Sequence, residues 1–509
     1  MRRMRPLRAL VGLLVLAGCA TSSQPTTFKI LQLNDVYKIE GMARGELGGL
    51  ARLRTLRKQL EADGSAVLLL HAGDALYPSV MSKYLEAKPM VDVMNLLDGD
   101  SERFDPGLIV GFGNHELDNR TPDILVERLR QSQFQWLTTN TLRCDPECSR
   151  RFPDTEDVIV RDIGRTRVGI FAVLYPLQKT YAKSSDVSDA ASRAVKTLKR
   201  QGADVIIAIT HQNMPDDVDL VKEVEGIDLV IGGHDHIFMQ EQVDGTWITK
   251  GDADAKSVVV YDVTVPRRGR AEATPRRVML DSSVAKDERI DARVQEWLRE
   301  LSKKIDGDDV LATTTYLLEG VEPAVRGRET ALGNLLTDAA REQMGTDVAI
   351  VQGGTIRIND DIPPGPITDA DMEGIFYFTN RLVAFRATGQ QLLELLRNGV
   401  SRADSADGRF LQVSGVRFAY TPANGQFTVA PADVQVNGKP LDLNATYTVA
   451  TVDYLYLRGI EDGFEFFIDA NRPPKVNEER EGDYRKVVEK YLRDRGTITT
   501  NVEGRIARR

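Results

Sequence analysis

Between residues 28 and 265 the sequence repeats one local pattern, in which short apolar runs alternate with amphipathic stretches. Runs such as FKILQL, AVLLL, DVIIAI and SVVVYDVTV are short and often β-branched, which predicts strands. The intervening stretches, such as GLARLRTLRKQLEADG, repeat leucine at helical spacing, which predicts amphipathic helices. The alternation predicts an α/β domain, and it restricts the chain to folds in which helices cover a sheet.

The chain of 509 residues is too long for one core, so more than one domain is expected. Residues 284–307 are polar with few apolar positions, which predicts a linking helix, and a second α/β domain is expected over 308–509. The net charge of −9 argues against a nucleic-acid polymer as partner. The densest basic stretch, PRRGRAEATPRR (266–277), contains turn formers and is interpreted as a solvated loop rather than a polyanion site.

Residues 1–18 carry four arginines and then an apolar run that is too short to span a bilayer, as in a secretory signal. The run ends in Leu16-Ala17-Gly18-Cys19, which resembles the bacterial lipoprotein lipobox and predicts cleavage before Cys19 and lipidation of its sulfur. The alternative is an ordinary signal peptide with a chance cysteine. Residues 19–27 are then a flexible tether. The protein is expected to be exported and lipid-anchored to a bacterial membrane, on the periplasmic or cell-surface side.

The two cysteines that remain, Cys144 and Cys148, flank an Asp-Pro turn in RCDPECSRR. An exported chain meets an oxidising compartment, where such a pair tends to close, so a disulfide is predicted. A metal site is disfavoured, because no other cysteine or histidine lies close in sequence.

Histidines and acids lie where the predicted strands end. These residues are Asp35 (FKILQLND), His71 and Asp74 (AVLLLHAGD), Asn114, His115 and Asp118 (LIVGFGNHELD), His211 (DVIIAITH), and His234 and His236 (DLVIGGHDH). Loops at the carboxyl ends of strands converge in open α/β sheets. Imidazole, carboxylate and amide ligands suit borderline divalent ions, and a carboxylate can bridge two of them about 3.5–4 Å apart. One such histidine alone would be interpreted as a core or turn residue, but four of these five histidines together, each at a strand end, predict a dinuclear centre for Mn, Zn, Co, Fe or Mg.

In this order, LND, AGD, GNHELD, ITH and GGHDH resemble the motifs of the calcineurin-like metallophosphatases. The second half adds GRETALGNLLTDA (327–339), QGGTIR (352–357), FYFTNRL (376–382) and YLRGIEDGF. Together they are similar to the bacterial 5′-nucleotidase / UDP-sugar hydrolase family, from about residue 28 to the C-terminus. The resemblance implies a four-layer α/β/β/α metallophosphatase domain over 28–283 and a nucleotidase substrate-binding domain over 308–509.

The resemblance also assigns roles to the strand-end residues. It implies Asp74 as the carboxylate that bridges both ions, Asp35 and His236 at the first ion, and Asn114, His211 and His234 at the second. His115, oriented by Asp118, would stand beside the scissile phosphate as an acid or a transition-state stabiliser.

In the second domain, the resemblance implies side chains that bind the substrate. Arg328 and Arg357 match arginines that bind phosphate, for which a planar guanidinium is suited. Phe378 and Tyr454 match the two aromatics that sandwich a base; without the motif, each would be interpreted as a core residue. Asp462 matches the carboxylate near the ribose.

Some residues depart from the family pattern. Tyr37 stands where the family usually has histidine, and a neutral phenol with a pKa of about 10 is a poor metal ligand, so the first site is expected to be weaker or completed by water or another side chain. His71 is interpreted as a structural residue or one behind the ligands, with a compensating ligand as the alternative. Gln352 replaces the expected asparagine of NGG, and Thr379-Asn380 replaces a glycine pair near the base pocket. The sequence therefore does not assign the identity of the substrate base.

The sequence therefore predicts an exported 5′-nucleotidase, which hydrolyses nucleotides or nucleotide sugars by attack of a metal-activated water on phosphorus. The candidate ligands precede residue 240 and the candidate substrate residues follow residue 320, so the site is expected between the domains, with 284–307 as the hinge. One alternative is a 2′,3′-cyclic phosphodiesterase/3′-nucleotidase on the same centre. Another is a non-catalytic nucleotide-binding lipoprotein, although a binder has no need of His115 with Asp118. The oligomeric state is left open.

Overall fold

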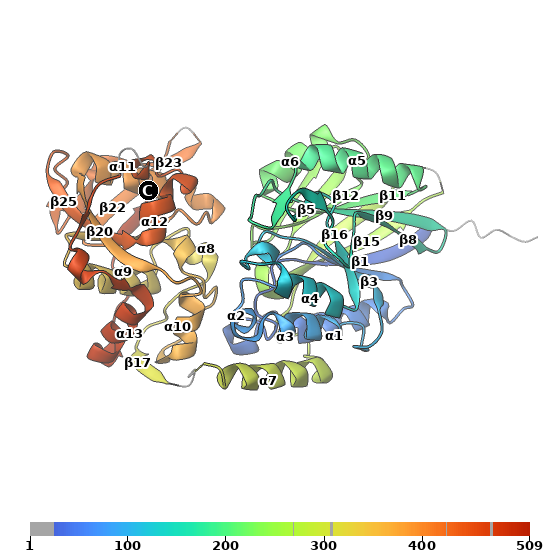
Figure 1. The fold of residues 1–509 in the computed structure, drawn as a ribbon, viewed down its shortest axis with the longest axis horizontal. Helices are drawn as coiled ribbons and strands as arrows, with labels where there is room; N and C mark the ends of the chain where they lie inside the picture. The colour runs from blue at the N-terminus through green and yellow to red at the C-terminus, as the bar shows by residue number, and fades with distance from the viewer. Residues whose placement is uncertain (1–24, 268, 306–308, 424, 469–471) are drawn as a thin grey trace, which may run out of the picture.

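The computed structural model describes residues 25–267, 269–305, 309–423, 425–468 and 472–509. Figure 1 shows two α/β lobes side by side, and α7 (Glu288–Ser302) leads from the first towards β17 (Val310–Thr314) of the second. The predicted signal segment and Cys19 lie outside the described residues. Within the described part of the chain, none of the helices has both the length and the apolar character needed to cross a membrane.

Two sheets form the centre of the first lobe. The first has the order β16-β15-β1-β2-β3-β4-β7, with bounds Glu272–Met279, Ser257–Val265, Thr26–Leu33, Val67–His71, Asp105–Gly111, Phe134–Leu137 and Thr155–Glu156. The second has the order β13-β14-β12-β11-β9-β8, with bounds Met239–Val243, Thr246–Lys250, Leu229–Gly233, Val205–His211, Thr166–Leu174 and Val158–Ile163. β1, β2 and β3 run parallel, as do β9, β11 and β12, so their carboxyl ends lie at common edges.

The two sheets pack face to face, and helices cover both outer faces (Figure 1). Aliphatic side chains from both sheets, such as Ile30 and Leu70 of the first and Ile207 and Ile231 of the second, form the shared inner core. The first sheet is covered by α1 (Leu50–Glu61), α2 (Val80–Leu85), α3 (Lys88–Met94), α4 (Asp123–Gln131) and α7. The second is covered by α5 (Val187–Arg200) and α6 (Met214–Glu223). The predicted four-layer α/β/β/α architecture is confirmed.

The helix expected between residues 284 and 307 is α7, and it packs on the first lobe. Its buried side chains Ile290, Val294 and Leu301 belong to the same core as α1 and α3. This helix therefore packs as part of the first lobe. At the other end, β1 already begins at Thr26, inside the stretch expected to be a tether.

A smaller three-stranded sheet at the surface of the first lobe contains the predicted cysteine pair. Its order is β10-β5-β6, with bounds Ala182–Ser184, Thr141–Cys144 and Cys148–Arg150. β5 and β6 form a hairpin in which Cys144 and Cys148 face each other, and the structure contains the disulfide between them.

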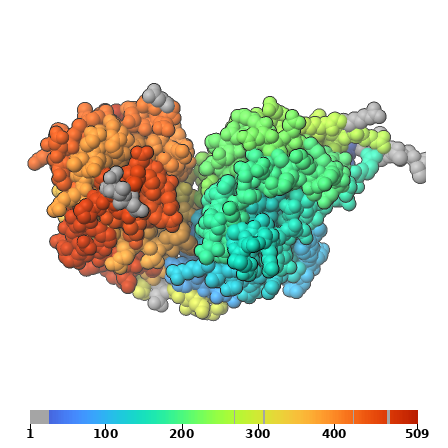
Figure 2. Space-filling view, turned by 45° about the horizontal axis from the view of Figure 1, so that its top comes forward, coloured from blue at the N-terminus to red at the C-terminus, as the bar shows by residue number. Residues whose placement is uncertain are grey.

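The second lobe has three sheets around one core. The first sheet contains β21 (Leu411–Ser414), β18 (Val348–Gln352), β25 (Thr446–Val452), β20 (Arg381–Thr388), β26 (Lys475–Val476) and β27 (Gly482–Asp483). The second contains β24 (Lys439–Pro440), β23 (Gln426–Val436), β22 (Val416–Ala423) and β29 (Ile506–Arg508). The third contains β19 (Gly365–Thr368), β17 and β28 (Thr497–Ile498). The helices are α8 (Glu322–Val325), α9 (Ala331–Met344), α10 (Asp369–Ile375), α11 (Gly389–Val400), α12 (Asp453–Arg458) and α13 (Tyr484–Arg495). Figure 2 shows a furrow where this lobe faces the first.

Candidate metal centre

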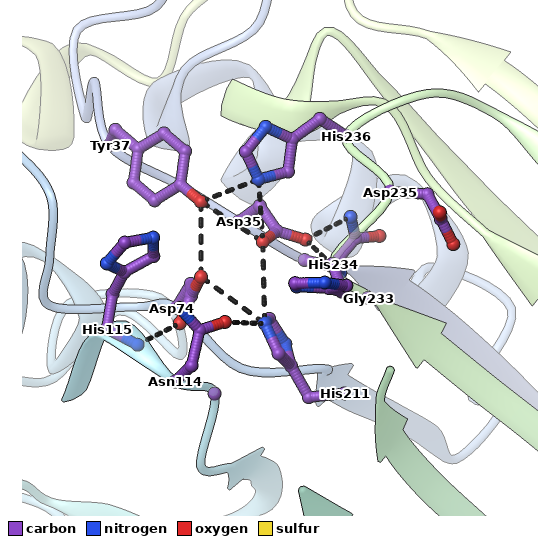
Figure 3. A network of polar contacts seen from close by, with 12 residues as sticks. Asp35, Tyr37, Asp74, Asn114, His115, His211, Gly233, His234, Asp235 and His236 are labelled. Atoms are coloured by element: carbon purple, nitrogen blue, oxygen red, sulfur yellow. Dashed lines mark hydrogen bonds and ion pairs between the residues drawn. The ribbon is translucent and has the colours of Figure 1, made fainter. Parts of the chain in front are cut away.

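The predicted ligands meet at the edge where the parallel strands of both sheets end (Figure 3). β1, β2 and β3 deliver Asp35, Asp74 and Asn114 from the first sheet. β11 ends at His211, and the loop after β12 carries His234 and His236. The two sheets of the sandwich therefore supply one site together.

The backbone around these residues is unusual. Asp35, Asp74, His234 and His236 all have positive φ, at 52°, 55°, 81° and 59°. Such conformations are strained for residues other than glycine and persist where the surroundings enforce them, which is common at functional sites. Gly113 makes the close packing possible, because a Cβ there would lie 2.2 Å from Asp74 Oδ1.

A first set of donor atoms surrounds the Tyr37 hydroxyl. Tyr37 Oη lies 3.1 Å from Asp35 Oδ1, 3.3 Å from Asp74 Oδ2 and 2.9 Å from His236 Nε2. Asp35 Oδ1 and His236 Nε2 are 3.3 Å apart. Two ligand atoms at about 2.1 Å from one cation, along perpendicular directions, lie about 3 Å apart. The phenol oxygen thus lies among the donor atoms of the first site, while burial and the Asp35 and Asp74 charges raise the pKa of Tyr37 further above its ordinary value, so its hydroxyl stays neutral.

A second set of donor atoms shares the same oxygen of Asp74. His211 Nε2 lies 3.3 Å from Asp74 Oδ2 and 3.1 Å from Asn114 Oδ1. The His234 ring lies beside His211, with ring centroids 5.1 Å apart. Asp35, Asp74 and His211 each offer a ligand atom within 4.8 Å of the others. The donors thus fit two cations that share the Asp74 carboxylate.

Two buried carboxylates and two protonated histidines set the charge of the site. Burial opposes a charge on His211 and His236, but neighbouring carboxylates outweigh it and raise the pKa of His211 to about 9 and that of His236 to about 10. Burial likewise opposes charge on Asp35 and Asp74, but the histidines hold the pKa of both carboxyls below its usual range. Burial lowers the pKa of His234, so its ring is neutral and able to act as a ligand. Protons on two imidazoles thus balance the two carboxylates, and cations would replace them.

Residues behind the ligands hold them in place. His211 Nδ1 donates to the Ala72 carbonyl at 2.7 Å, which points Nε2 at the donors. His236 Nδ1 is hydrogen-bonded to Glu322 of the second lobe. The buried Glu116 carboxylate accepts four backbone N–H groups from the loops of Asp74 and Asn114. The sequence reasoning missed both glutamates; Glu116 lies inside the GNHELD motif, whereas no sequence signal marks Glu322.

The dyad of His115 and Asp118 borders the donors. His115 Nδ1 lies 2.6 Å from Asp118 Oδ2, and the His115 backbone N–H donates to Asp74 Oδ1 at 2.8 Å. Lys179 Nζ lies 3.2 Å from the other Asp118 oxygen. Burial opposes a charge on Asp118, but the hydrogen bond and charge of His115 lower the pKa of its carboxyl. The dyad is thus fixed relative to the shared carboxylate.

His71 is buried at the end of β2, behind this site. Burial lowers the pKa of His71 to about 4, so its ring is neutral. Among the described residues neither ring nitrogen has a hydrogen-bond partner. The structure therefore does not bring His71 into the donor sets.

In the second lobe, Arg357 faces the first donor set. Arg357 Nη1 lies 3.3 Å from Glu322 Oε1, and its guanidinium lies 5.8 Å from the centre of the Phe378 ring. Arg326, two residues before the predicted Arg328, also bonds Glu322. Arg328 instead forms two 2.7 Å bonds to Glu319, and its side chain is 55% exposed. The structure thus places Arg326, rather than Arg328, beside Arg357.

The remaining predicted substrate residues are Gln352, Phe378, Tyr454 and Asp462 of the second lobe. Gln352 Nε2 donates to Asp462 Oδ2 at 2.8 Å. Tyr454 lies close to Asp462, and burial together with the Asp462 charge raises the pKa of Tyr454 to about 12. Phe378 lines a cavity of about 380 Å³ with Asp118 of the first lobe. Phe378 and Tyr454 are 41% and 38% exposed as whole residues, so neither is a core residue.

Comparisons with known proteins agree with this architecture. Residues 28–238 match the calcineurin-like phosphoesterases, and residues 310–469 match the 5′-nucleotidase C-terminal domain. The chain is 27% identical to a 5′-nucleotidase of Vibrio vulnificus over 87% of this chain and 88% of that protein. It is 25% identical to a snake venom 5′-nucleotidase of Naja atra over 94% of this chain and 98% of that protein. A crystal structure of a 5′-nucleotidase precursor from Thermus thermophilus has a TM-score of 0.78 at 25% identity, covering 95% of this chain and 99% of that one.

Fold, donor sets and matched regions define a two-domain calcineurin-like phosphoesterase. Among these, the chain belongs to the 5′-nucleotidase family, whose members are phosphoester hydrolases. The resemblance drawn from the motifs is confirmed.

Proposed function

We propose that this chain hydrolyses the phosphoester of a nucleotide or nucleotide sugar, with two divalent cations at the donor sets and the nucleoside held by the second lobe. The observation that carries the proposal is the position of Asp74 Oδ2, 3.3 Å from both Tyr37 Oη and His211 Nε2. One oxygen thus belongs to both donor sets. Two cations on a shared carboxylate would activate a water for attack and neutralise charge on the phosphoryl oxygens.

His115 is the acid or stabilising cation of the proposed reaction. Its Nδ1 is engaged by Asp118, which leaves Nε2 to face a substrate. A protonated ring can give its proton to the leaving oxygen or stabilise negative charge on the phosphoryl group. A protein that only bound nucleotides would have no use for this dyad.

The second lobe supports a nucleotide as the substrate. The exposed Phe378 ring lines the same cavity as Asp118, so a base stacked on this ring would place its phosphate near the dyad. Arg357 lies between this ring and the first donor set, and its planar fork suits a phosphate. Gln352, Tyr454 and Asp462 offer polar groups for a sugar or base.

A phosphate-release assay tests the proposal. The substrates are nucleoside 5′-monophosphates, nucleotide sugars and 2′,3′-cyclic nucleotides, each with Mn²⁺, Zn²⁺, Co²⁺ or Mg²⁺ and with a chelator. We expect release from 5′-nucleotides or nucleotide sugars that chelation abolishes and Mn²⁺ or Co²⁺ restores. Faster turnover of cyclic nucleotides would favour a phosphodiesterase instead. Full activity in protein shown to hold no metal would refute the mechanism.

We further propose that the protein is exported and anchored by a lipid on Cys19. The lipobox-like Leu16-Ala17-Gly18-Cys19 and the disulfide between Cys144 and Cys148 support this, because disulfides persist mainly in oxidising compartments. Intact-mass measurement of membrane-extracted protein should show a chain that begins with a lipidated Cys19. A mature chain that begins elsewhere would contradict the anchor.

A further inference from the structure

Glu322 reaches across the boundary between the lobes to a ligand of the first donor set. It begins α8 of the second lobe, and its side chain is buried. Glu322 Oε2 is hydrogen-bonded to His236 Nδ1, while Oε1 is held by Arg326 and lies 3.3 Å from Arg357 Nη1. The two arginines belong to the second lobe, so the Glu322 carboxylate is held by its own lobe independently of its contact with His236.

The two sides of the His236 ring have different partners. Nε2 lies among the donors, 3.3 Å from Asp35 Oδ1 and 2.9 Å from Tyr37 Oη. Nδ1 points away from them, to Glu322. When a carboxylate holds the proton of Nδ1, the ring is fixed in orientation and Nε2 becomes a more basic ligand. His211 has a corresponding partner, the Ala72 carbonyl, but that partner lies in its own lobe.

Further contacts between the lobes surround this pair. The Glu322 backbone N–H donates to Asn359 Oδ1 at 3.0 Å, and Asn359 Nδ2 donates to Asp254 Oδ2 at 3.1 Å. Asp254 Oδ1 in turn accepts the backbone N–H of Tyr37 at 2.8 Å. The lobes thus meet at the first donor set, and separating them would remove the partner of His236.

We propose that Glu322 is a positioning residue for His236, and that cation binding at the first donor set and closure of the second lobe are therefore coupled. If closure orients His236 and strengthens the site, a cation at the site must favour closure to the same extent, because coupling between two equilibria is reciprocal. The second donor set has no partner of this kind among the residues described above. The inference rests on the proposed cation sites.

Glu322→Gln is the direct test, with Glu319→Gln as the matched control. Glutamine keeps the volume and one acceptor oxygen but removes the charge. Glu319 lies three residues earlier and pairs with the exposed Arg328, away from the donors. We would strip the purified full chain with a chelator and titrate it with Mn²⁺ in a calorimeter. We expect two sites in the wild type, and loss of about 10- to 100-fold in affinity at one of them in Glu322→Gln only.

Hydrogen exchange of the wild type gives a second readout that does not depend on a variant. Residues 320–328 contain no proposed metal ligand, so protection of their amides on adding Mn²⁺ reports closure. We expect this protection in the wild type and in Glu319→Gln, and a marked reduction of it in Glu322→Gln.

The outcomes separate this inference from the proposed function. A wild type that binds no Mn²⁺ overturns both. Two Mn²⁺ sites in the wild type, with no change of protection over 320–328 or with unchanged affinities in Glu322→Gln, overturn only the coupling through Glu322.

Discussion

Glu116 holds the loop that carries Asp74, the carboxylate shared by both donor sets. The substitution Glu116→Gln tests how much this contact contributes to the free energy of unfolding. Its carboxylate accepts the backbone N–H groups of Asp74 (2.9 Å) and Gly113 (2.6 Å) on one oxygen, and those of Ala75 (2.7 Å) and Leu76 (3.0 Å) on the other. Glutamine replaces one oxygen by an NH₂ donor, so in either orientation two buried N–H groups lose their acceptor. Each N–H group left without an acceptor costs about 1–3 kcal/mol, or about 2–6 kcal/mol for the two. Burial and the Asp74 charge raise the pKa of Glu116 to about 7, so glutamine also removes an unfavourable buried charge, and the net loss in the free energy of unfolding is expected at the lower end of that range.

Tryptophan fluorescence during urea unfolding is a suitable assay, because the three tryptophans, at 136, 247 and 297, all lie in the first lobe. Wild type and variant are compared after chelation, so that metal binding does not add to stability. Glu225→Gln is the control, since Glu225 is exposed in the loop after α6 and should change stability by less than about 0.5 kcal/mol. A loss for Glu116→Gln as small as that of the control would show that the loop does not depend on this carboxylate.

Four other changes test the site. Because neighbouring carboxylates raise the pKa of His211 to about 9, a bound cation must displace its proton, so Mn²⁺ affinity should rise with pH from about 6.5 to 9; calorimetry in buffers of different ionisation enthalpy measures the released protons. Tyr37→His should retain the first Mn²⁺ more tightly than the wild type on dialysis, because imidazole is a better ligand than a neutral phenol, whereas Tyr37→Phe should match the wild type. Equal retention by Tyr37→His and the wild type would contradict the weakened first site, and release of one Mn²⁺ per chain from Tyr37→Phe would show that the phenol oxygen is a ligand. Phe378→Ala should raise KM for a nucleotide, since stacking contributes about 1–3 kcal/mol per base, and should leave an aryl phosphate nearly unaffected; equal losses would mean that the ring has only a structural role. Arg326→Gln should raise KM for the same nucleotide more than Arg328→Gln does, and the reverse order would restore the motif-based assignment.

Local sequence determined much of the first lobe. The apolar runs such as FKILQL and DVIIAI are β1 and β11, and the leucine stripe after Gly49 is the buried face of α1. In the second lobe, Thr388 and Gln391, three positions apart, form the capping box that starts α11. These features depend on residues a few positions apart, so periodicity and capping chemistry are sufficient to find them.

The donor residues were also predictable, for a topological reason. Parallel neighbouring strands end at one edge, so the residues just after each of them must lie close together. Asp35, Asp74 and His211 could therefore be grouped from their positions after apolar runs, although up to 176 residues separate them.

Tertiary structure alone decided which side chains support those donors. Glu322 meets His236 across 86 residues, and no local pattern marks either residue as the partner of the other. Arg326 and Arg328 lie in the same motif, but the end of α8 turns Arg326 towards Glu322 and leaves Arg328 with Glu319. Helix α7 is polar enough to be interpreted as a free linker, yet its few apolar residues pack on the first lobe. The pairing of Glu322 with His236 and the packing of α7 depend on how surfaces far apart in the sequence meet, and the choice between Arg326 and Arg328 depends on where α8 ends, so none of the three can be derived from residue spacing.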